Sequence, residues 1–388
     1  MRITLVIESL GGGGAERVAS IMADYWAEHG QEVTLITLAS EREDFYSVHS
    51  RIHRIALGLT GPSYSFAHAI RNNVMRSKGL RHAIKASRPD CVLSFLDTTN
   101  VLTLVATLGL GIPVIVCEHT DPRQRDLGPV WEGLRRLFYP RAAALVVLTE
   151  SVRCWAEGIV ASNAVYVIPN SVPTAAVQHN GVRHMRDSGG TISAMGRLVA
   201  LKGFDILLEA FSRCAEKHRD WSLIILGEGE ERRRLENLAM ELGIADRVRM
   251  PGRTEDPFRI LRETDLFVLS SRCEGFPMAL VEAMACNLAV ISTDCPSGPR
   301  DIIRDGTDGV LIPPDDVESL AAAMDRLMAS PAERERLGTR AVEVVERFSA
   351  ERVMKLWDEV MRHACGVGGQ MTDALMHGVK HLRVDTKL

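Results

Sequence analysis

The chain has 388 residues, which is more than one hydrophobic core usually organises, so we expect two domains. Hydrophobic residues make up 46% of the chain and charged residues 25%, and the formal net charge is −4. This balance is ordinary for a soluble globular protein and gives no reason to expect a nucleic-acid partner.

Residues 1–8 form a short apolar strand followed by an acid, without the longer apolar region of an export signal. The longest uncharged run, 98–117, is interrupted by Gly109, Gly111 and Pro113, so it predicts a buried helix, a turn and a strand rather than a membrane span. The eight cysteines include no C-x-x-C pair, and several lie in apolar runs. They predict reduced, mostly buried thiols in a cytosolic protein, with no zinc site and no disulfide framework.

Apolar strands and helical stretches alternate along the chain, which predicts parallel sheets covered by helices on both faces. In the first half, the expected strands are residues 3–7, 32–37, 91–95, 113–117, 144–148 and 165–168. A polar stretch at 170–190 then predicts a linker. The second half restarts the pattern with strands at 192–194, 222–226, 248–250, 266–269, 289–292 and 309–312, separated by helices such as 203–216, 231–242, 278–285 and 317–328.

The expected fold is therefore α/β, with two Rossmann-like doubly wound domains facing each other across a cleft. The domains span 1–170 and 190–347 and are joined by a linker at 171–189; a last helix at 348–363 precedes a tail at 364–388 of unknown role. Doubly wound sheets bind ligands at the carboxyl ends of their strands, so residues directly after the strands are the site candidates.

Two strand ends in the first half carry such candidates. After the first strand, a glycine run that includes Gly13 and Gly14 leads into a helix and lets backbone N–H groups approach an anion. Glu16 occupies the last glycine position of a G-x-G-x-x-G pattern, which disfavours NAD. His119 follows the strand at 113–117, where a structural imidazole is the alternative to a functional one.

Cations follow the first strand of the second half. Arg197 and Lys202 lie just before a helix expected to begin near Gly203, so they can clamp a diphosphate. The alternative is a solvated basic turn. Gly229 and Arg253 follow the next two strands, and each lies in a turn whose glycine lets the backbone approach another group closely.

Two carboxylates form the most informative pattern. Glu274 follows the strand at 266–269, and Glu282 lies two turns into a helix initiated by Gly275-Phe276-Pro277, so both acids can face one crevice. The N–H groups at such a helix N-terminus attract anions, and proline suits the first turn because it has no donor. This unit can hold a phosphorylated sugar while the carboxylates bind hydroxyl groups. The alternative is a generic turn with two solvated acids.

Together these motifs resemble family-four retaining glycosyltransferases of the GT-B fold, over essentially residues 1–363. The resemblance implies that Arg197 and Lys202 bind the diphosphate of a nucleotide sugar and that Glu282 binds its ribose. It further implies that Glu274 contacts the transferred sugar and that His119 lies beside the anomeric carbon. The implied donor-binding set is completed by Gly13, Gly14, Gly229, Arg253, Gly275, Phe276 and Pro277. By the same resemblance, the last helix, with Trp357, folds back onto the first domain.

The expected chemistry needs neither a metal nor a cofactor. No D-x-D sequence occurs, so chelated metal is disfavoured as the stabiliser of the departing phosphate, and Arg197 with Lys202 is the available substitute. The nucleotide sugar is a substrate. Because both glutamates are committed to hydroxyl recognition, we expect front-face attack, with the departing phosphate oxygen taking the acceptor's proton, rather than a covalent intermediate.

A basic helix predicts the acceptor. The stretch 66–88 carries no acid, and at about 100° per residue it places Arg71, Lys78, Arg81, Lys85 and Arg88 on one face beside Phe66, Ile70, Leu80 and Ile84. Such a helix suits an anionic membrane surface or a polyprenyl diphosphate, with Arg71, Lys78, Arg81 and Lys85 as the contact residues. The alternative is a solvated helix packed by its apolar edge.

The loop at 294–301 resembles that of bacterial enzymes that extend undecaprenyl-diphosphate glycans, including N-acetylgalactosamine transferases, which favours a UDP-sugar over GDP-mannose. The expectation is a retaining hexosyltransferase at the inner face of the cell membrane, acting on a polyprenyl-diphosphate-linked glycan in surface polysaccharide or glycoprotein glycan assembly. The alternatives are a soluble GT-B enzyme with a non-lipid acceptor, a GDP-mannose-dependent mannosyltransferase and a non-catalytic binding module.

Overall fold

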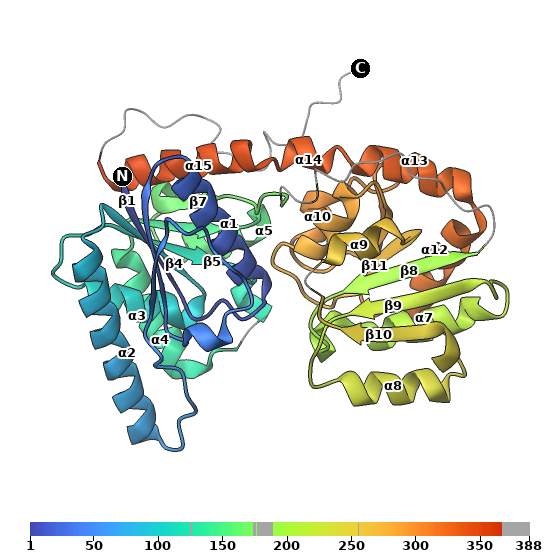
Figure 1. The fold of residues 1–388 in the computed structure, drawn as a ribbon, viewed down its shortest axis with the longest axis horizontal. Coiled ribbons are helices and arrows are strands. Elements are labelled where there is room, and N and C mark those ends of the chain that lie inside the picture. Colours follow the sequence, from blue (N-terminus) through green and yellow to red (C-terminus); the bar gives the residue numbers. More distant parts are fainter. Residues whose placement is uncertain (125, 174–175, 177–188, 255, 367–388) are drawn as a thin grey trace. The chain divides into compact units, whose positions relative to one another are not determined.

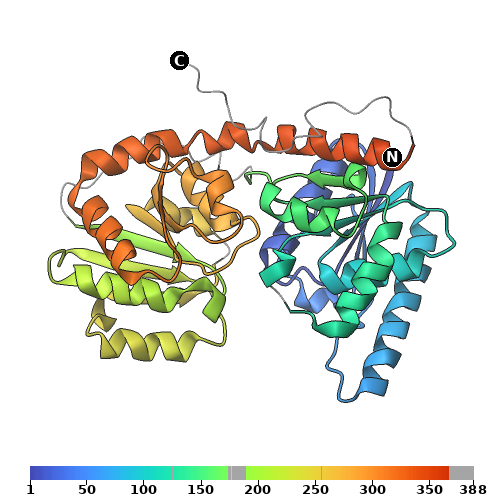
Figure 2. The same ribbon diagram turned by 180° about the vertical axis from the view of Figure 1, so that it is seen from behind.

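The computed structural model describes residues 1–124, 126–173, 176, 189–254 and 256–366, and these divide into two compact units. The first unit comprises Met1–Asn170 with the chain from Glu351 onward, and the second comprises Ser171–Ala350. Most of the expected linker and tail lies outside the described residues. Each unit is one parallel sheet with helices on both faces (Figure 1; seen from behind in Figure 2).

The first unit contains a seven-stranded sheet in the order β3-β2-β1-β4-β5-β6-β7. All neighbouring strands pair in parallel. The strands are β1 (Arg2–Ile7), β2 (Glu32–Thr37), β3 (His53–Ala56), β4 (Cys91–Phe95), β5 (Val114–Glu118), β6 (Ala144–Val147) and β7 (Val165–Val167). Every residue of β4 is buried, as expected for an apolar strand covered on both faces.

The helices of the first unit cover its sheet, and all of them except α15 follow one of its strands. They are α1 (Gly14–Glu28), α2 (Phe66–Ser87), α3 (Asp97–Thr107), α4 (Gly128–Phe138), α5 (Glu150–Glu157) and α15 (Ala350–Ala364). In α15, Trp357 is buried, and the neighbouring Asp358 accepts a 3.1 Å hydrogen bond from the indole N–H of Trp26. The helix begins two residues later than expected, because Phe348 is the C-cap residue of the preceding helix, Val344–Arg347, and has a non-helical backbone. The ring of Phe348 packs against Phe276 of the second unit, with 5.3 Å between centroids.

The second unit contains a six-stranded parallel sheet in the order β10-β9-β8-β11-β12-β13. Its strands are β8 (Gly190–Met195), β9 (Trp221–Leu226), β10 (Val248–Gly252), β11 (Leu266–Leu269), β12 (Ala289–Thr293) and β13 (Val310–Ile312). Its helices are α7 (Phe204–Ala215), α8 (Arg232–Glu241), α9 (Pro257–Arg262), α10 (Met278–Ala285), α11 (Pro299–Ile302), α12 (Val317–Ala329), α13 (Pro331–Ala341) and α14 (Val344–Arg347). Among the described residues, no helix has the length and apolar content needed to cross a bilayer.

The strand order reverses beside the first strand of each sheet. β1 lies between β2 and β4, and β8 lies between β9 and β11. Doubly wound sheets bind ligands at this point, outside the carboxyl ends of the strands. The loops after β1 and β5 carry candidate residues of the first unit, and those after β8, β9, β10 and β11 carry the candidates of the second.

The structure confirms the α/β fold with two doubly wound domains. It adds one strand, β3, that we did not expect from the sequence. β3 is the edge of its sheet, and none of its four residues is fully buried, so it lacks the apolar run that marked the other strands. All eight cysteines are free thiols, and five of them are buried.

Candidate active site

The loop after β8 carries both predicted cations of the second unit. Arg197 is exposed, whereas Lys202 ends a short 3-10 turn, Ala200–Lys202, and is partly buried. Gly203 follows in the left-handed conformation, with φ of 59°. A Cβ at Gly203 would lie 2.1 Å from the carbonyl oxygen of Ser270, so only glycine lets this loop pack against the loop after β11.

Lys202 and Glu274 contact each other directly. The ammonium of Lys202 donates to Glu274 Oε1 at 2.6 Å, and the Ser271 hydroxyl donates to the same oxygen at 2.6 Å. The Lys202 side chain is 22% exposed and that of Glu274 is 8% exposed. The two residues predicted for the diphosphate and the transferred sugar therefore form one partly buried ion pair at the switch point of the second sheet.

The turn after β11 is fixed from behind by the loop that follows β12. The Ser297 hydroxyl donates a short hydrogen bond to the carbonyl oxygen of Glu274. Phe276 and Pro277 are buried, and Pro277 is the N-cap residue of α10 rather than part of its first turn. This arrangement gives the Gly275-Phe276-Pro277 backbone a defined position beside the ion pair.

Glu282 lies closer to the start of its helix than we expected. Because α10 begins at Met278, Glu282 is just over one turn into the helix, and the expectation of two turns is wrong. Its side chain is fully buried. Full burial of this carboxylate is unusual, because acids are almost never fully buried unless they have a partner. It argues against the alternative of a generic turn with solvated acids.

Gly229 serves a packing role that the sequence did not reveal. A Cβ at this position would lie 2.2 Å from the carbonyl oxygen of Leu198, in the loop that carries the cations. The two loops are also joined by a 2.9 Å hydrogen bond from Leu198 N to Glu228 O. The backbone that approaches Gly229 is therefore the chain's own. Arg253, after β10, is exposed.

The glycine run of the first unit ends where α1 begins. Gly13 is the N-cap residue and Gly14 the first residue of α1. A Cβ on Gly13 would lie only 2.2 Å from Glu16 Oε2, so the Glu16 carboxylate folds back over the start of its own helix. An acid at this position is stabilised by the helix dipole and competes with any external anion for the same place.

His119 directly follows β5 and is 8% exposed. Its ring lies 5.3 Å from that of Phe95, between centroids. Within the described residues, neither ring nitrogen has a hydrogen-bond partner. Burial lowers the pKa of His119 to about 4, so the imidazole is neutral near pH 7. A buried imidazole without a protein partner for either nitrogen is uncommon, and both nitrogens can form hydrogen bonds to a ligand or to water.

Behind His119 lies a buried polar cluster that sequence reasoning missed. The Tyr139 hydroxyl donates a short hydrogen bond to Glu118 Oε1, and Arg135 contacts Asp97 at 3.2 Å and Glu118 at 3.7 Å. Burial first, and then the charge of Asp97, raise the pKa of Glu118 well above its ordinary value. Asn100 donates to the Cys117 carbonyl at 3.0 Å, which connects the cluster to the backbone of β5. In the sequence, this cluster is indicated only by the polar residues Glu118 and Thr120 on either side of His119.

The structure thus gathers Lys202, Glu274 and the Phe276 turn in the second unit, whereas His119, Gly13 and Gly14 belong to the first. In the described part of the chain, no group of three or more His, Cys, Asp or Glu side chains has a geometry that would hold a metal ion.

Residues 12–176 match the family model Glycosyltransferase Family 4, and residues 184–344 match Glycosyl transferases group 1. The chain is 32% identical over 247 residues to the lipopolysaccharide core biosynthesis glycosyltransferase LpsE of Rhizobium meliloti, covering 60% of this chain and 71% of that one. It is 28% identical over 362 residues to the GalNAc-alpha-(1->4)-GalNAc-alpha-(1->3)-diNAcBac-PP-undecaprenol alpha-1,4-N-acetyl-D-galactosaminyltransferase of Campylobacter jejuni, covering 92% and 97%. It is 29% identical over 377 residues to the exopolysaccharide phosphotransferase SCO2592 of Streptomyces coelicolor, covering 90% of this chain but only 39% of that longer relative.

Solved structures agree on the fold. Sucrose-phosphate synthase of Thermosynechococcus elongatus has a TM-score of 0.79 at 18% identity, covering 95% of this chain and 100% of that one. Anabaena Alr3699/HepE in complex with UDP has a TM-score of 0.72 at 16% identity, covering 93% and 99%. Two Rossmann-like units with this topology define the GT-B class of glycosyltransferases. The chain belongs to glycosyltransferase family four of that class, and it is an enzyme.

Proposed function

We propose that the chain is a retaining glycosyltransferase that moves a hexose or N-acetylhexosamine from a UDP-sugar to a polyprenyl-diphosphate-linked glycan. The observation that carries the proposal is the Lys202–Glu274 pair at the switch point of the second sheet. It puts a cation for a phosphate and a carboxylate for sugar hydroxyls within 2.6 Å of each other. This separation fits a donor whose sugar and diphosphate are joined directly.

In the proposed mechanism, Arg197 and Lys202 stabilise the charge that develops on the departing diphosphate. Glu274 binds the transferred sugar, and Glu282 binds the ribose. Neutral His119 donates or accepts a hydrogen bond beside the anomeric carbon without adding charge. The acceptor attacks from the face that the diphosphate leaves, and a phosphate oxygen takes its proton. With two cations available, the reaction needs no metal ion.

The UDP preference is supported by two comparisons. The Campylobacter jejuni relative is named as an N-acetyl-D-galactosaminyltransferase acting on an undecaprenol-linked glycan, and the Anabaena neighbour was solved with UDP. The loop at 294–301, whose resemblance suggested such a donor, packs against the Glu274 turn through the Ser297 hydroxyl. It is therefore near enough to influence which sugar the turn accepts.

The lipid-linked acceptor is supported by the exposed surface of α2. Arg71, Lys78 and Lys85 are exposed, and the helix has no acid. Arg81 has another role, because its guanidinium donates to the carbonyl oxygens of Ala106 at 2.7 Å and Leu108 at 2.8 Å. Arg81 therefore binds the fold itself, and the proposed contact residues are Arg71, Lys78 and Lys85.

The N-terminal half of α2 adds an apolar component to this surface. Phe66, Ile70 and Val74 follow one another at four-residue intervals and are 73%, 52% and 47% exposed. In contrast, Leu80 and Ile84, which we expected on the same face, are buried in the core of the unit. This end of α2 extends beyond the rest of the first unit (Figures 1 and 2). Exposed apolar residues beside lysine and arginine suit the interface of an anionic membrane, and we propose peripheral binding at the inner face of the cell membrane.

The test is a donor screen with a short polyprenyl-diphosphate glycan as acceptor, using UDP-sugars and GDP-mannose, with NMR assignment of the new anomeric linkage. We expect turnover with a UDP-sugar, retention of the anomeric configuration and full activity in EDTA. Turnover with GDP-mannose alone would overturn the proposed UDP-sugar donor. A product with inverted anomeric configuration would overturn the retaining mechanism, and transfer to soluble acceptors alone would overturn the lipid-linked acceptor.

A further inference from the structure

Arg272 connects the loop that carries Lys202 to the loop that carries Glu274. Its backbone N–H donates to the Leu201 carbonyl at 2.8 Å, and its guanidinium donates to the Ala200 carbonyl at 2.5 Å. Ala200 and Leu201 directly precede Lys202, while Arg272 lies two residues before Glu274. Arg272 therefore joins the two loops that carry the ion pair.

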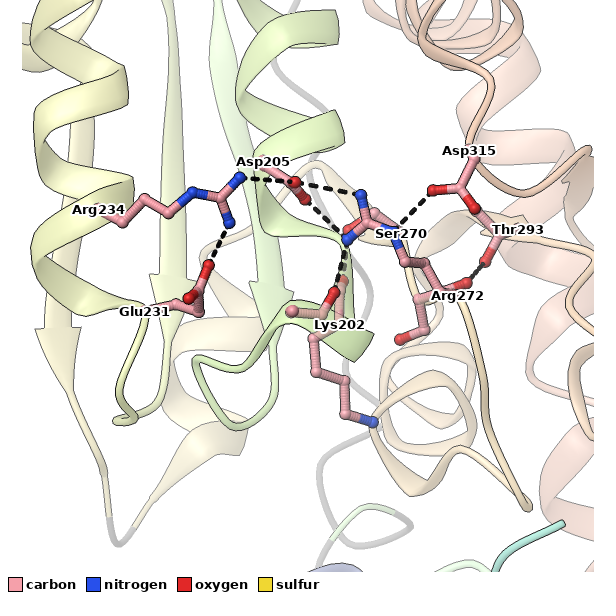
Figure 3. A network of polar contacts seen from close by, with 10 residues as sticks. Lys202, Asp205, Glu231, Arg234, Ser270, Arg272, Thr293 and Asp315 are labelled. Carbon is pink, nitrogen blue, oxygen red and sulfur yellow. Dashed lines mark hydrogen bonds and ion pairs between the residues drawn. The ribbon is translucent and has the colours of Figure 1, made fainter. Parts of the chain in front are cut away.

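The guanidinium of Arg272 is held in place by two acids (Figure 3). It binds both oxygens of Asp205, at 3.0 and 3.1 Å, and Asp315 at 2.7 Å. Burial acts to raise the pKa of Asp205, but the hydrogen bonds and charge of Arg272 outweigh it and lower that pKa. A bidentate arginine-carboxylate contact fixes the orientation of the guanidinium as well as its distance from the carboxylate. The Arg272 side chain is therefore held in one position.

One further hydrogen bond holds the same loops together, because the Ser270 hydroxyl donates to the Lys202 carbonyl at 3.0 Å. The Thr293 hydroxyl, at the end of β12, donates to the Ser271 carbonyl at 2.5 Å and anchors the Glu274 loop to the neighbouring strand. The two loops also touch where Gly203 lies against Ser270. The charge of Arg272 is matched by Asp205 and Asp315, which separates its role from that of the exposed Arg197.

We propose that Arg272 is a positioning residue that sets the placement of Lys202 relative to Glu274, and hence the affinity for the donor diphosphate. The inference rests on the proposed function, because it takes the ion pair to be the donor site. Arg272 does not touch the donor. It acts through Lys202, whose loop it ties to the Glu274 loop and to Asp205 at the start of α7.

The decisive experiment is a double-mutant cycle on UDP binding and on UDP-sugar turnover, with Arg272→Ala, Lys202→Ala and the double variant. If Arg272 acts through Lys202, Arg272→Ala should weaken UDP binding about tenfold in the wild type and about twofold or less in the Lys202→Ala background. Equal losses in both backgrounds would overturn the proposal. So would unchanged UDP affinity in Arg272→Ala.

A matched control is Arg234→Ala. Arg234 also binds Asp205, at 3.4 Å, together with Glu231 (Figure 3), and neither of these acids belongs to a loop of the ion pair. It should leave UDP affinity and turnover unchanged, and a loss equal to that of Arg272→Ala would show that Asp205 alone matters.

A milder variant covers the case in which Arg272→Ala does not fold. Asp315→Asn weakens one contact of the Arg272 guanidinium and keeps its contacts with Asp205 and Ala200. It should therefore cause a smaller loss of UDP affinity than Arg272→Ala, and that loss should disappear in the Lys202→Ala background. Added guanidinium ion should restore UDP affinity to Arg272→Ala, whereas added ammonium should not. If the wild type binds no nucleotide and turns over no donor, both the proposed function and this inference are wrong. If the wild type is active but the effects of Arg272→Ala and Lys202→Ala simply add, only the inference about Arg272 is wrong.

Discussion

Lys202 Nζ lies 2.6 Å from Glu274 Oε1, so two residues assigned to different parts of a donor bind each other. The ammonium is already paired, and a diphosphate must compete with the carboxylate for it. A sugar hydroxyl that donates to Glu274 would favour this exchange, because it replaces a hydrogen bond that the carboxylate loses. The pair thus makes binding of the sugar and binding of the phosphate depend on each other.

Removing either cation should slow the chemical step. Lys202→Ala and Arg197→Ala should each lower turnover by about two powers of ten or more, corresponding to about 2.7 kcal/mol of transition-state stabilisation. Lys202→Ala should also lower the unfolding temperature, because it leaves the largely buried Glu274 carboxylate without its cation. Arg197 is exposed, so its removal should not. Steady-state kinetics and thermal unfolding check both. Normal turnover in both variants would contradict the clamp.

The two glutamates should have separable effects on kinetics. Glu282→Gln should mainly raise the donor KM, because ribose contacts act in the ground state and the transition state alike. Glu274→Gln should mainly lower kcat, since its contact is with the sugar whose bond breaks. Glutamine is preferred to alanine because Glu282 is fully buried and truncation would leave a cavity. Equal rises in KM with turnover intact would show that the role of Glu274 is misassigned.

His119 should make folding stability depend on pH. The unfolded chain protonates this histidine below its ordinary pKa of 6.5, whereas the folded protein does so only below about 4. The stability contribution is therefore complete above pH 6.5 and is lost as the pH falls towards 4, by about 3 kcal/mol over that range. Chemical denaturation of wild type and His119→Gln from pH 4 to pH 7 measures it. The variant should lose correspondingly less stability on acidification, and parallel profiles would contradict the prediction.

Glu118 should make folding stability depend on pH in the direction opposite to that of His119. Its raised pKa means that the folded protein keeps a proton that the unfolded chain releases above about pH 4.5, so its contribution to stability falls as the pH rises. Glu118→Gln keeps the shape and removes the titration. Its stability relative to wild type should increase above pH 4.5 by up to about 1.4 kcal/mol per pH unit. A difference that is constant with pH would mean that Glu118 is ionised in the folded protein, with Arg135 as its sufficient counter-charge.

The sequence predicted the two sheets well because their strands are apolar on both faces. β2, β4 and β11 have the expected bounds, and most of the others differ by one or two residues at an end. β3 was missed because an edge strand needs no apolar run. Most of the proposed donor-site residues directly follow a strand, and those positions were predictable, since doubly wound sheets place such loops together.

The interactions among those loops were not predictable in the same way. The sequence predicts a close backbone approach at Gly229 without naming the other group, which in the structure is the Leu198 carbonyl. The cluster of Asp97, Glu118 and Arg135 joins residues up to 38 positions apart, with no local pattern to mark it. Such contacts depend on tertiary packing, which neither periodicity nor spacing records.

The exposed face of α2 gives the last prediction. Changing Arg71, Lys78 and Lys85 together to Gln should cost on the order of 1 kcal/mol each in binding to anionic vesicles. Binding by the wild type should fall as salt rises, because the Debye length shortens from about 10 Å at 0.1 M to about 3 Å at 1 M. Donor hydrolysis without acceptor should be unchanged, since those residues lie in the first unit and the donor cations in the second.

The apolar residues of the same helix give a matched comparison. Changing Phe66 and Ile70 to Ser should weaken vesicle binding at high salt as well as at low salt, because burial of apolar side chains in the interface is not screened. Arg81→Gln is the control, since its guanidinium binds carbonyl groups of the fold and its loss should lower stability without changing vesicle affinity. Vesicle binding by the basic triple variant that equals wild type at low salt would make α2 an ordinary solvated helix. The preferred acceptor would then be a soluble one.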